Sequence, residues 1–190
     1  MIETLKAKLS TFRQKMYNTF KKRADATFEL VDALSSNRDA KSIVELSLNP
    51  VHRRNYSSIT RAVDEYYSGT SAKDHDIKNK TTKALLSEQC PDLVNRPFHL
   101  FAVDCTPNER IFSPTLKDRS PVYNPRPTVP TNKPVTIGHQ YSVAVYLPEK
   151  LSEPTAPWVV PLSAERVSTD QKGVLVGMQQ ITSIINENKG

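Results

Sequence analysis

The sequence predicts a mixed α+β protein in which a helical N-terminal region precedes a small sheet and a final helix. Up to Tyr67, apolar residues recur every three or four positions, which is the spacing of amphipathic helices. Over residues 136–147 the side chains alternate with a period of two, which indicates a strand. After Ser168 the helical spacing returns. We therefore expect a helical region over 1–80 and a sheet-containing region over 81–190.

The first helical stretch spans residues 3–34. Its apolar stripe is built from residues at steps of three or four, namely Leu5, Leu9, Phe12, Met16 and Phe20. Phe28, Val31 and Leu34 continue the same period and allow for a second helix. Because apolar stripes of this kind usually face a core, we expect them to pack there.

A second helical pair is predicted over residues 42–48 and 58–67. The first of these ends at Asn49-Pro50, because proline cannot continue a helix, and Ser57 is the expected N-cap of the second. The two helices flank a basic connection, an arrangement that resembles a helix-turn-helix. The likeness is loose, because the connection is about twice the usual three to four residues.

Positive charge is concentrated in the N-terminal part of the chain. The net charge is +6 over 190 residues; residues 1–80 carry fifteen basic and ten acidic residues, and the remainder carries eleven and ten. Such a surplus favours a polyanion partner such as DNA, although lysines on a solvated helix also serve solubility. The candidate DNA contacts are the basic and aromatic residues around these helices: Lys21, Lys22, Arg23, Arg53, Arg54, Tyr56 and Arg61.

Residues 68–80 are polar and predict a linker or exposed loop, followed by a short helix over 81–89. The linker contains the triplet Asp74-His75-Asp76, whose side chains are types that bind metals. No further ligand residue lies nearby in the sequence, so we expect the triplet to be solvated.

Cysteine content and hydropathy exclude several classes of protein. Cys90 and Cys105 are too few for a disulfide framework or a zinc site, and they fit a reducing cytoplasm. No apolar run reaches the length of about 18 residues that a membrane span needs, and the first thirty residues lack the apolar centre of a signal peptide. We therefore expect no membrane partner.

The most informative segment is residues 97–107, in which an unbroken apolar run ends at Asp104. Such a run is typical of a central strand that is covered on both faces. A carboxylate at the end of a buried strand costs desolvation energy unless a partner compensates it, and metal ions are the usual partners in phosphoryl-transfer enzymes. The alternative is a loop aspartate that makes a turn hydrogen bond ahead of Pro107.

Residues 107–134 are predicted to form a long proline-rich insertion. Six prolines fall between Pro114 and Pro134. They exclude a helix and argue against a central strand, because proline lacks the amide that both structures require. Long loops in compact domains are usually functional or disordered.

The strand predicted over 136–147 places different side chains on its two faces. Ile137, His139, Tyr141, Val143, Val145 and Leu147 share one face; Gly138, Gln140, Ser142, Ala144 and Tyr146 share the other. His139 has two interpretations. It is packed and hydrogen-bonded in the core, which is the commoner case, or it approaches a site of metal and substrate.

A further strand is predicted at residues 158–162, where Pro161 favours an edge position or a bulge. Ser168-Thr169-Asp170-Gln171 has the pattern of a capping box and predicts the start of the last helix. That helix carries one apolar stripe, formed by Val174, Met178, Ile181 and Ile185.

Three strands followed by a helix, with an acid at the end of the first strand, resemble the opening half of an RNase H-like fold. Several sequence blocks are also similar to bacterial insertion-sequence transposases of the DDE type. They are FHLFAVDCTPN, DRSPVYNPRP, NKPVTIGHQYSVAVYLPEK and PWVVPLSAERV, with FELVDAL, SIVELSLNP and YSSI upstream. The likeness covers residues 25–185, and its specificity lies in the order of the blocks.

This resemblance implies an enzyme that cuts and rejoins DNA at the ends of a mobile element. Two divalent metal ions, Mg²⁺ or Mn²⁺, would be held by three carboxylates, and Asp104 occupies the place of the first. The positions of the second and third lie beyond this sequence. The other acids of the second half are not in equivalent places: Asp118, Glu149, Glu165 and Asp170.

We therefore expect an N-terminal fragment of a DDE transposase, inactive alone and without a stably bound metal. It would be cytoplasmic and associated with the bacterial nucleoid, and it would self-associate or pair with a missing C-terminal half. The alternative is a non-enzymatic DNA-binding regulator derived from a transposase. A third possibility is an unrelated protein in which Asp104 is structural.

Overall fold

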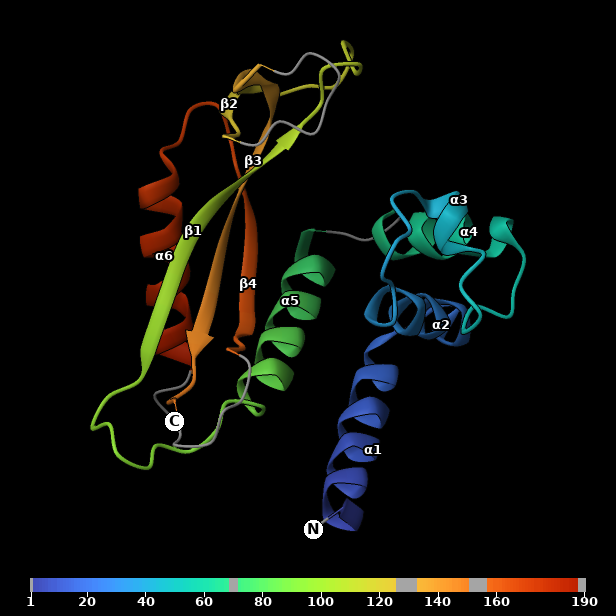
Figure 1. Cartoon of the computed structure of the whole chain (residues 1–190), viewed down its shortest axis with the longest axis vertical. Helices are drawn as coiled ribbons and strands as arrows, with labels where there is room; N and C mark the ends of the chain where they lie inside the picture. The colour runs from blue at the N-terminus through green and yellow to red at the C-terminus, as the bar shows by residue number, and fades with distance from the viewer. Residues whose placement is uncertain (1, 69–71, 126–132, 151–156, 188–190) are drawn as a thin grey trace. The chain divides into compact units, whose positions relative to one another are not determined.

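The computed structural model describes residues 2–68, 72–125, 133–150 and 157–187, and only the backbone of residues 72–76. The chain divides into two compact units, residues 1–85 and 86–190 (Figure 1). Helices come first, and an antiparallel sheet and a C-terminal helix follow, so the predicted α+β class is confirmed.

The first unit consists of helices. In chain order they are α1 (Ile2–Thr19), α2 (Ala24–Ser35), α3 (Ile43–Leu46), α4 (Tyr56–Tyr67) and α5 (Ala72–Ser87), which ends in the second unit. The predicted stretch 3–34 is two helices, because the chain turns at Arg23, whose φ of 44° is left-handed. The prediction of a loop over 68–80 is wrong for residues 72–80, which are helical and continue into the predicted helix 81–89.

The core of the first unit is small and is built largely from alanines. Ala26 and Ala33 of α2 and Ala62 of α4 are buried, and Ile59 is fully enclosed. Short side chains let α2 and α4 approach closely. Aromatic edges extend this core, since the ring of Phe20 lies 6.4 Å from Phe28 and 6.3 Å from Tyr66.

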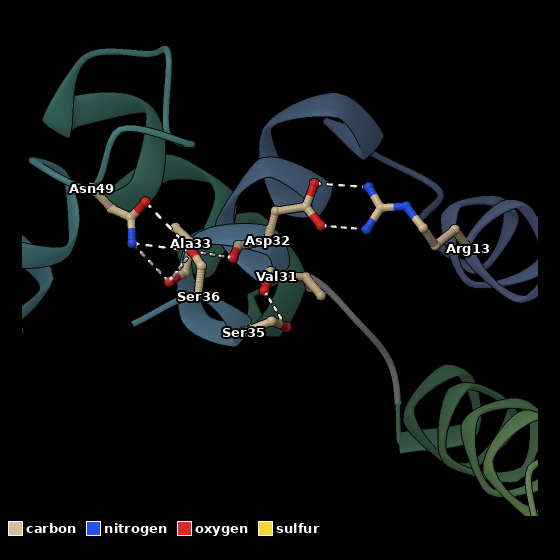
Figure 2. Close-up of polar contacts among 7 residues, drawn as sticks. All are labelled: Arg13, Val31, Asp32, Ala33, Ser35, Ser36 and Asn49. Atoms are coloured by element: carbon tan, nitrogen blue, oxygen red, sulfur yellow. Dashed lines mark hydrogen bonds and ion pairs between the residues drawn. The ribbon is translucent and has the colours of Figure 1, made fainter. Parts of the chain in front are cut away.

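Polar side chains hold both flanks of α2 (Figure 2). Arg13 of α1 forms two hydrogen bonds with Asp32, at 2.6 and 2.9 Å. On the other side, the side-chain amide of Asn49 donates to the Ala33 carbonyl and to the Ser36 hydroxyl, both at 3.2 Å. Asn49 was predicted to end a helix, but α3 already ends at Leu46 and Asn49 instead satisfies a carbonyl near the end of α2.

The second unit is a four-stranded antiparallel sheet covered by one helix. Its elements are β1 (Leu100–Glu109), β2 (Ser120–Tyr123), β3 (Val135–Leu147), β4 (Val160–Val167) and α6 (Gly173–Glu187). The long strand β3 pairs with β1 along one side, and with β2 and β4 on the other. Among the described residues β1 therefore has a single neighbour and forms an edge of the sheet.

Two predictions that rest on prolines are each confirmed in one part and wrong in another. Pro161 lies in β4, which begins at Val160 and extends to Val167, so the predicted bounds 158–162 are wrong. The described partner of β4 is β3 alone, and a register shift occurs where Val145 opposes Pro161, so the two alternatives, an edge position and a bulge, both occur. The insertion 107–134 contains no helix in its described residues, as predicted, but it is not wholly irregular. Its start belongs to β1 and it contains β2; residues 126–132 lie outside the described part.

The predicted capping box at the start of α6 is wrong. The Ser168 hydroxyl donates to the side chains of Asp170 and Gln171 and does not accept from a helix amide. The helix begins at Gly173, and the carbonyl of Lys172 accepts its first backbone hydrogen bonds. Residues 168–171 instead form a turn between β4 and α6.

The face of α6 that packs on the sheet is not the apolar stripe that the sequence suggested. Val176, Gly177, Gln180 and Ile184 are buried. Of the predicted stripe, Val174, Met178 and Ile185 are exposed. The face that packs on the sheet contains small and polar residues as well as apolar ones, because the helix lies very close to the sheet. A Cβ atom at Gly177, for example, would lie 2.6 Å from Val103 Cγ1.

A buried amide network joins α6 to the two strands beneath it. Gln180 is almost fully enclosed; it accepts a hydrogen bond from the Ser142 hydroxyl at 2.6 Å. Its amide nitrogen donates to the Ser142 carbonyl at 3.1 Å and to the Ser163 hydroxyl at 3.0 Å. The polar face of β3 thus meets the helix, and the side chains there are fully hydrogen-bonded, as buried polar groups require.

We predict that Gln180→Ala lowers the free energy of unfolding of the second unit by about 2–3 kcal/mol, because it leaves buried serine groups without partners. Urea unfolding followed by the fluorescence of Trp158, the single tryptophan, measures it. The matched control is Gln179→Ala on the exposed side of α6, with an effect below about 0.5 kcal/mol. Equal losses in both variants would contradict the role of the network.

Candidate functional site

Asp104 lies in the middle of β1, where its residue pairs with Val143 of β3. Two parts of the prediction are wrong. The strand does not end at Asp104 but continues to Glu109, and the residue is exposed rather than buried. The apolar run suggested a strand covered on both faces, yet β1 is an edge strand and its Leu100 and Val103 are about 40% exposed.

The Asp104 side chain is on the face of the sheet opposite to α6. Val103 lies next to Gly177 of α6 and Cys105 lies next to Gly173. Because successive side chains of a strand point to opposite faces, Asp104 between them points away from the helix. One carboxylate oxygen, Oδ1, accepts the backbone N–H of Cys105 at 2.8 Å. The carboxylate is therefore accessible to a cation or to another molecule.

A groove lies between the edge of β1 and α6, with a volume of about 630 Å³ and Asp104 on its lining. The remaining lining is mostly apolar and includes Val103, Val174, Met178 and Ile181. Exposed apolar residues beside an unpaired strand edge form a surface that is suited to contact with further polypeptide.

The start of β1 is positioned by a carboxylate that sequence reasoning did not identify as structural. Glu149, which follows β3, accepts the backbone N–H groups of Asn95 at 2.9 Å, Arg96 at 2.8 Å and Val94 at 3.3 Å. The Arg96 guanidinium in turn donates to the Leu147 carbonyl at 2.8 Å. These bonds close one end of the β1–β3 pair, and so they help to set the register that places Asp104 opposite Val143.

Asp118 makes a similar connection at the other end of the sheet. It accepts the backbone N–H of Thr169 at 2.9 Å and the hydroxyl of Thr169 at 2.7 Å, and Arg166 lies 2.7 Å away. Its own φ of 59° is left-handed, a conformation that aspartate tolerates. The insertion is thereby fastened to the turn before α6.

His139 is buried, and its Nε2 lies 3.1 Å from the Lys117 carbonyl while its ring meets the edge of Tyr141. The prediction of a packed, hydrogen-bonded histidine is confirmed. Among the described residues, no group of three or more histidine, cysteine, aspartate or glutamate side chains could hold a metal ion. The side chains of Asp74, His75 and Asp76 lie outside the described part.

Several candidate DNA contacts are bound to acids of their own unit. The buried Glu29 of α2 accepts the Arg53 guanidinium at 2.9 Å and lies 3.4 Å from Arg54. Arg23 pairs with Glu65 of α4 at 2.7 Å. These ion pairs hold the connection before α4 and the turn between α1 and α2 in place.

The other candidates lie on the surface, as the three ion-paired arginines also do. Lys21 and Lys22 are exposed between α1 and α2, Tyr56 is half-exposed at the first turn of α4, and Arg61 is exposed on that helix. The predicted helix-turn-helix is wrong, because α3 has four residues and nine residues separate it from α4. The N-cap of α4 is Asn55 rather than Ser57.

Sequence reasoning missed Glu29, Glu149 and Asp118. For Glu29 a signal existed, since the residue lies three positions after Ala26 and four before Ala33, on the side of α2 that packs. For the other two acids the partners are 51 to 55 residues distant in the chain, so no local pattern marks them.

The family model described as DDE superfamily endonuclease matches residues 15–188. No curated protein matches the chain, and no solved structure does. In the described residues no helix is long and apolar enough to cross a membrane.

We predict that acid weakens the second unit through Glu149. Three backbone N–H groups, that of Asn95 first, lower the pKa of this carboxyl in the folded state. Its stabilisation is therefore complete above the unfolded pKa of about 4.3 and is lost as the pH falls through the lower folded pKa.

Melting temperatures of the wild type and Glu149→Gln between pH 7 and pH 3 measure this effect. The variant melts lower at pH 7, and the difference shrinks towards pH 3. Asp92→Asn, an exposed carboxylate of the preceding loop, is the control and keeps the wild-type melting temperature at pH 7. A constant difference across the pH range would contradict the prediction.

Proposed function

This chain belongs to the DDE superfamily endonucleases, and on that basis we propose that it is the part of a DNA-cleaving transposase that supplies the DNA-contacting helices and the first metal-binding carboxylate, Asp104. The family match carries the proposal, because it spans both units and includes the whole sheet. The order β1, β3, β4 and α6 supports it, since it resembles the beginning of an RNase H-like domain.

Asp104 suits one part of a metal site. Its strand is held by hydrogen bonds at both ends, and its carboxylate is exposed, so Mg²⁺ or Mn²⁺ could bind it without prior unfolding. The described residues do not fit a complete two-metal site, because they bring no second and third acid to Asp104. We derive no catalytic step from this chain alone.

We propose that the further carboxylates of a two-metal site come from polypeptide that pairs with the edge of β1. Ten residues of this strand have β3 as their described neighbour on one side, and the apolar groove between β1 and α6 adjoins the other. A strand added there would bury the groove and bring its own side chains next to Asp104.

Changing Asp104 tests its role in cleavage. Asp104→Asn in the complete product of the gene, assayed on DNA carrying the element ends with Mg²⁺ or Mn²⁺, should reduce strand cleavage by more than about 100-fold. Residues that merely support a metal ligand already cost about 10–100-fold when changed, and loss of a ligand costs more. DNA affinity should be unchanged.

The matched control is Asp170→Asn, an exposed acid in the turn before α6 whose partner is a serine. It should cleave at the wild-type rate. Cleavage by Asp104→Asn at that same rate would show that this carboxylate binds no catalytic metal.

For the DNA-contacting helices we expect Lys22 and Arg61 to meet phosphate, rather than the arginines that Glu29 and Glu65 bind. Lys22→Ala and Arg61→Ala should each weaken duplex binding and reduce the slope of log Kd against log salt by about 0.9, one phosphate contact each. Fluorescence anisotropy over a salt series measures it.

Two comparisons make this test specific. Lys172→Ala removes an exposed lysine from the second unit and should leave both affinity and slope unchanged. Arg53→Ala should act mainly by lowering the stability of the helical unit, because it leaves the buried Glu29 with one partner fewer. A salt slope that none of the variants alters would contradict DNA contact by these helices.

A DNA-binding regulator derived from a transposase is the second candidate, and the incomplete metal site of the described residues favours it. The two functions differ in one measurement. A regulator binds element ends but gives no cleavage with either metal in the complete gene product, whereas an endonuclease gives cleavage that depends on Asp104.

A further inference from the structure

Helix α1 carries an apolar stripe that the first unit does not cover. None of its residues is buried, and Ile2, Leu5 and Leu9 are 70%, 61% and 58% exposed. Together with Phe12 and Met16 they follow one another at steps of three and four, so they form one continuous face. Exposed aliphatic residues in a continuous row indicate a contact surface, unlike scattered ones.

The second half of α1 is braced by α2, whereas the first half is not. Phe28 of α2 lies against Tyr17, with ring centroids 5.6 Å apart. The Arg13 guanidinium lies over the Phe28 ring, 4.6 Å from its centroid. A groove of about 440 Å³ continues from there along Leu9 and Lys6. The stripe therefore begins as an open helix face and runs into a partly formed groove.

The residues that flank the stripe are all basic. With Ile2, Leu9 and Met16 at the first core position of a heptad, and Leu5 and Phe12 at the second, the flanking positions hold four cations: Lys6, Lys8, Arg13 and Lys15. The one acid of the helix, Glu3, pairs with Lys6, and α1 has a net charge of +3. Arg13 is already bound by Asp32.

Charge selects among the molecules that could cover this face. A second copy of α1 would bring lysine against lysine or arginine, since flanking positions face flanking positions in either orientation. Phosphate would satisfy the cations but would leave the aliphatic side chains in water. A helix with an apolar stripe and acidic flanks satisfies both features at once.

We propose that the first half of α1 docks an amphipathic helix of another protein whose flanking residues are acidic. The exposed part of the stripe, from Ile2 to Leu9, extends over little more than one heptad, which places the contact among small, transient interfaces. This surface includes neither Lys22 nor Arg61, and Asp104 belongs to the other unit, so the inference does not depend on DNA cleavage.

The test uses the full chain and two designed helical peptides as probes. Both carry Leu and Ile at the core positions; one has Glu at every flanking position and the other has Lys. Isothermal titration should give micromolar binding for the Glu peptide, and binding at least tenfold weaker for the Lys peptide. Lys8→Glu should reduce the difference in affinity between the Glu peptide and the Lys peptide.

A pair of variants separates docking from folding. Leu5→Gln/Leu9→Gln should weaken binding of the Glu peptide by at least tenfold while the melting temperature stays unchanged, because neither residue is buried. Ala7→Gln, on the opposite side of α1, introduces the same residue and should bind as the wild type does.

Five results would overturn the proposal. The Glu peptide does not bind, or binds equally to Leu5→Gln/Leu9→Gln. Sedimentation equilibrium finds a dimer that this double variant dissociates, so that a second copy covers the face. Vesicles containing anionic lipid bind the chain more tightly than the Glu peptide does, and the double variant no longer binds these vesicles. The double variant loses affinity for duplex DNA, so that the stripe serves the DNA contact.

Discussion

The close contact between α6 and the sheet is the constraint on which the second unit depends. A helix can approach strands this closely only where side chains are small, and here Gly177 faces Val103 while Ser142 faces Gln180. Once the helix is this near, its polar side chain is enclosed and must be hydrogen-bonded. The network on β3 and β4 satisfies that requirement and excludes other positions of the helix along the sheet.

Everything of functional interest on β1 follows from this packing. Val103 and Cys105 pack against α6, so the side chain of Asp104, which lies between them, points to the other face of the sheet. Glu149 and Arg96 set where β1 begins, and Asp118 holds the insertion against the turn before α6. The carboxylate is thus presented on a rigid strand whose outer edge and neighbouring groove are available to further polypeptide.

The first unit uses its charges differently. The surplus of basic residues in this unit suggested that all of them serve DNA binding. Three of them, however, form ion pairs within the unit: Arg23 with Glu65, and Arg53 and Arg54 with Glu29. Their loss is expected to affect folding more than binding. We expect an anionic partner to contact the exposed Lys22 and Arg61 instead, and α1 adds an aliphatic stripe that phosphate alone would not cover.

The sequence by itself determined the class of fold, the strand of period two at residues 136–147, and the edge position of β4 from Pro161. These properties depend on local periodicity or on the missing amide of proline. It also made Asp104 a candidate for a metal-binding carboxylate and contained the family blocks around it. The exposure of Asp104 could not be predicted, since an apolar run looks the same in a covered strand and in an edge strand. Only the tertiary structure decided which strands neighbour β1, which face of α6 packs, and which acids hold which loops, because these depend on contacts between residues that are far apart in the chain, such as Asp104 with Val143, Ser142 with Gln180 and Val94 with Glu149.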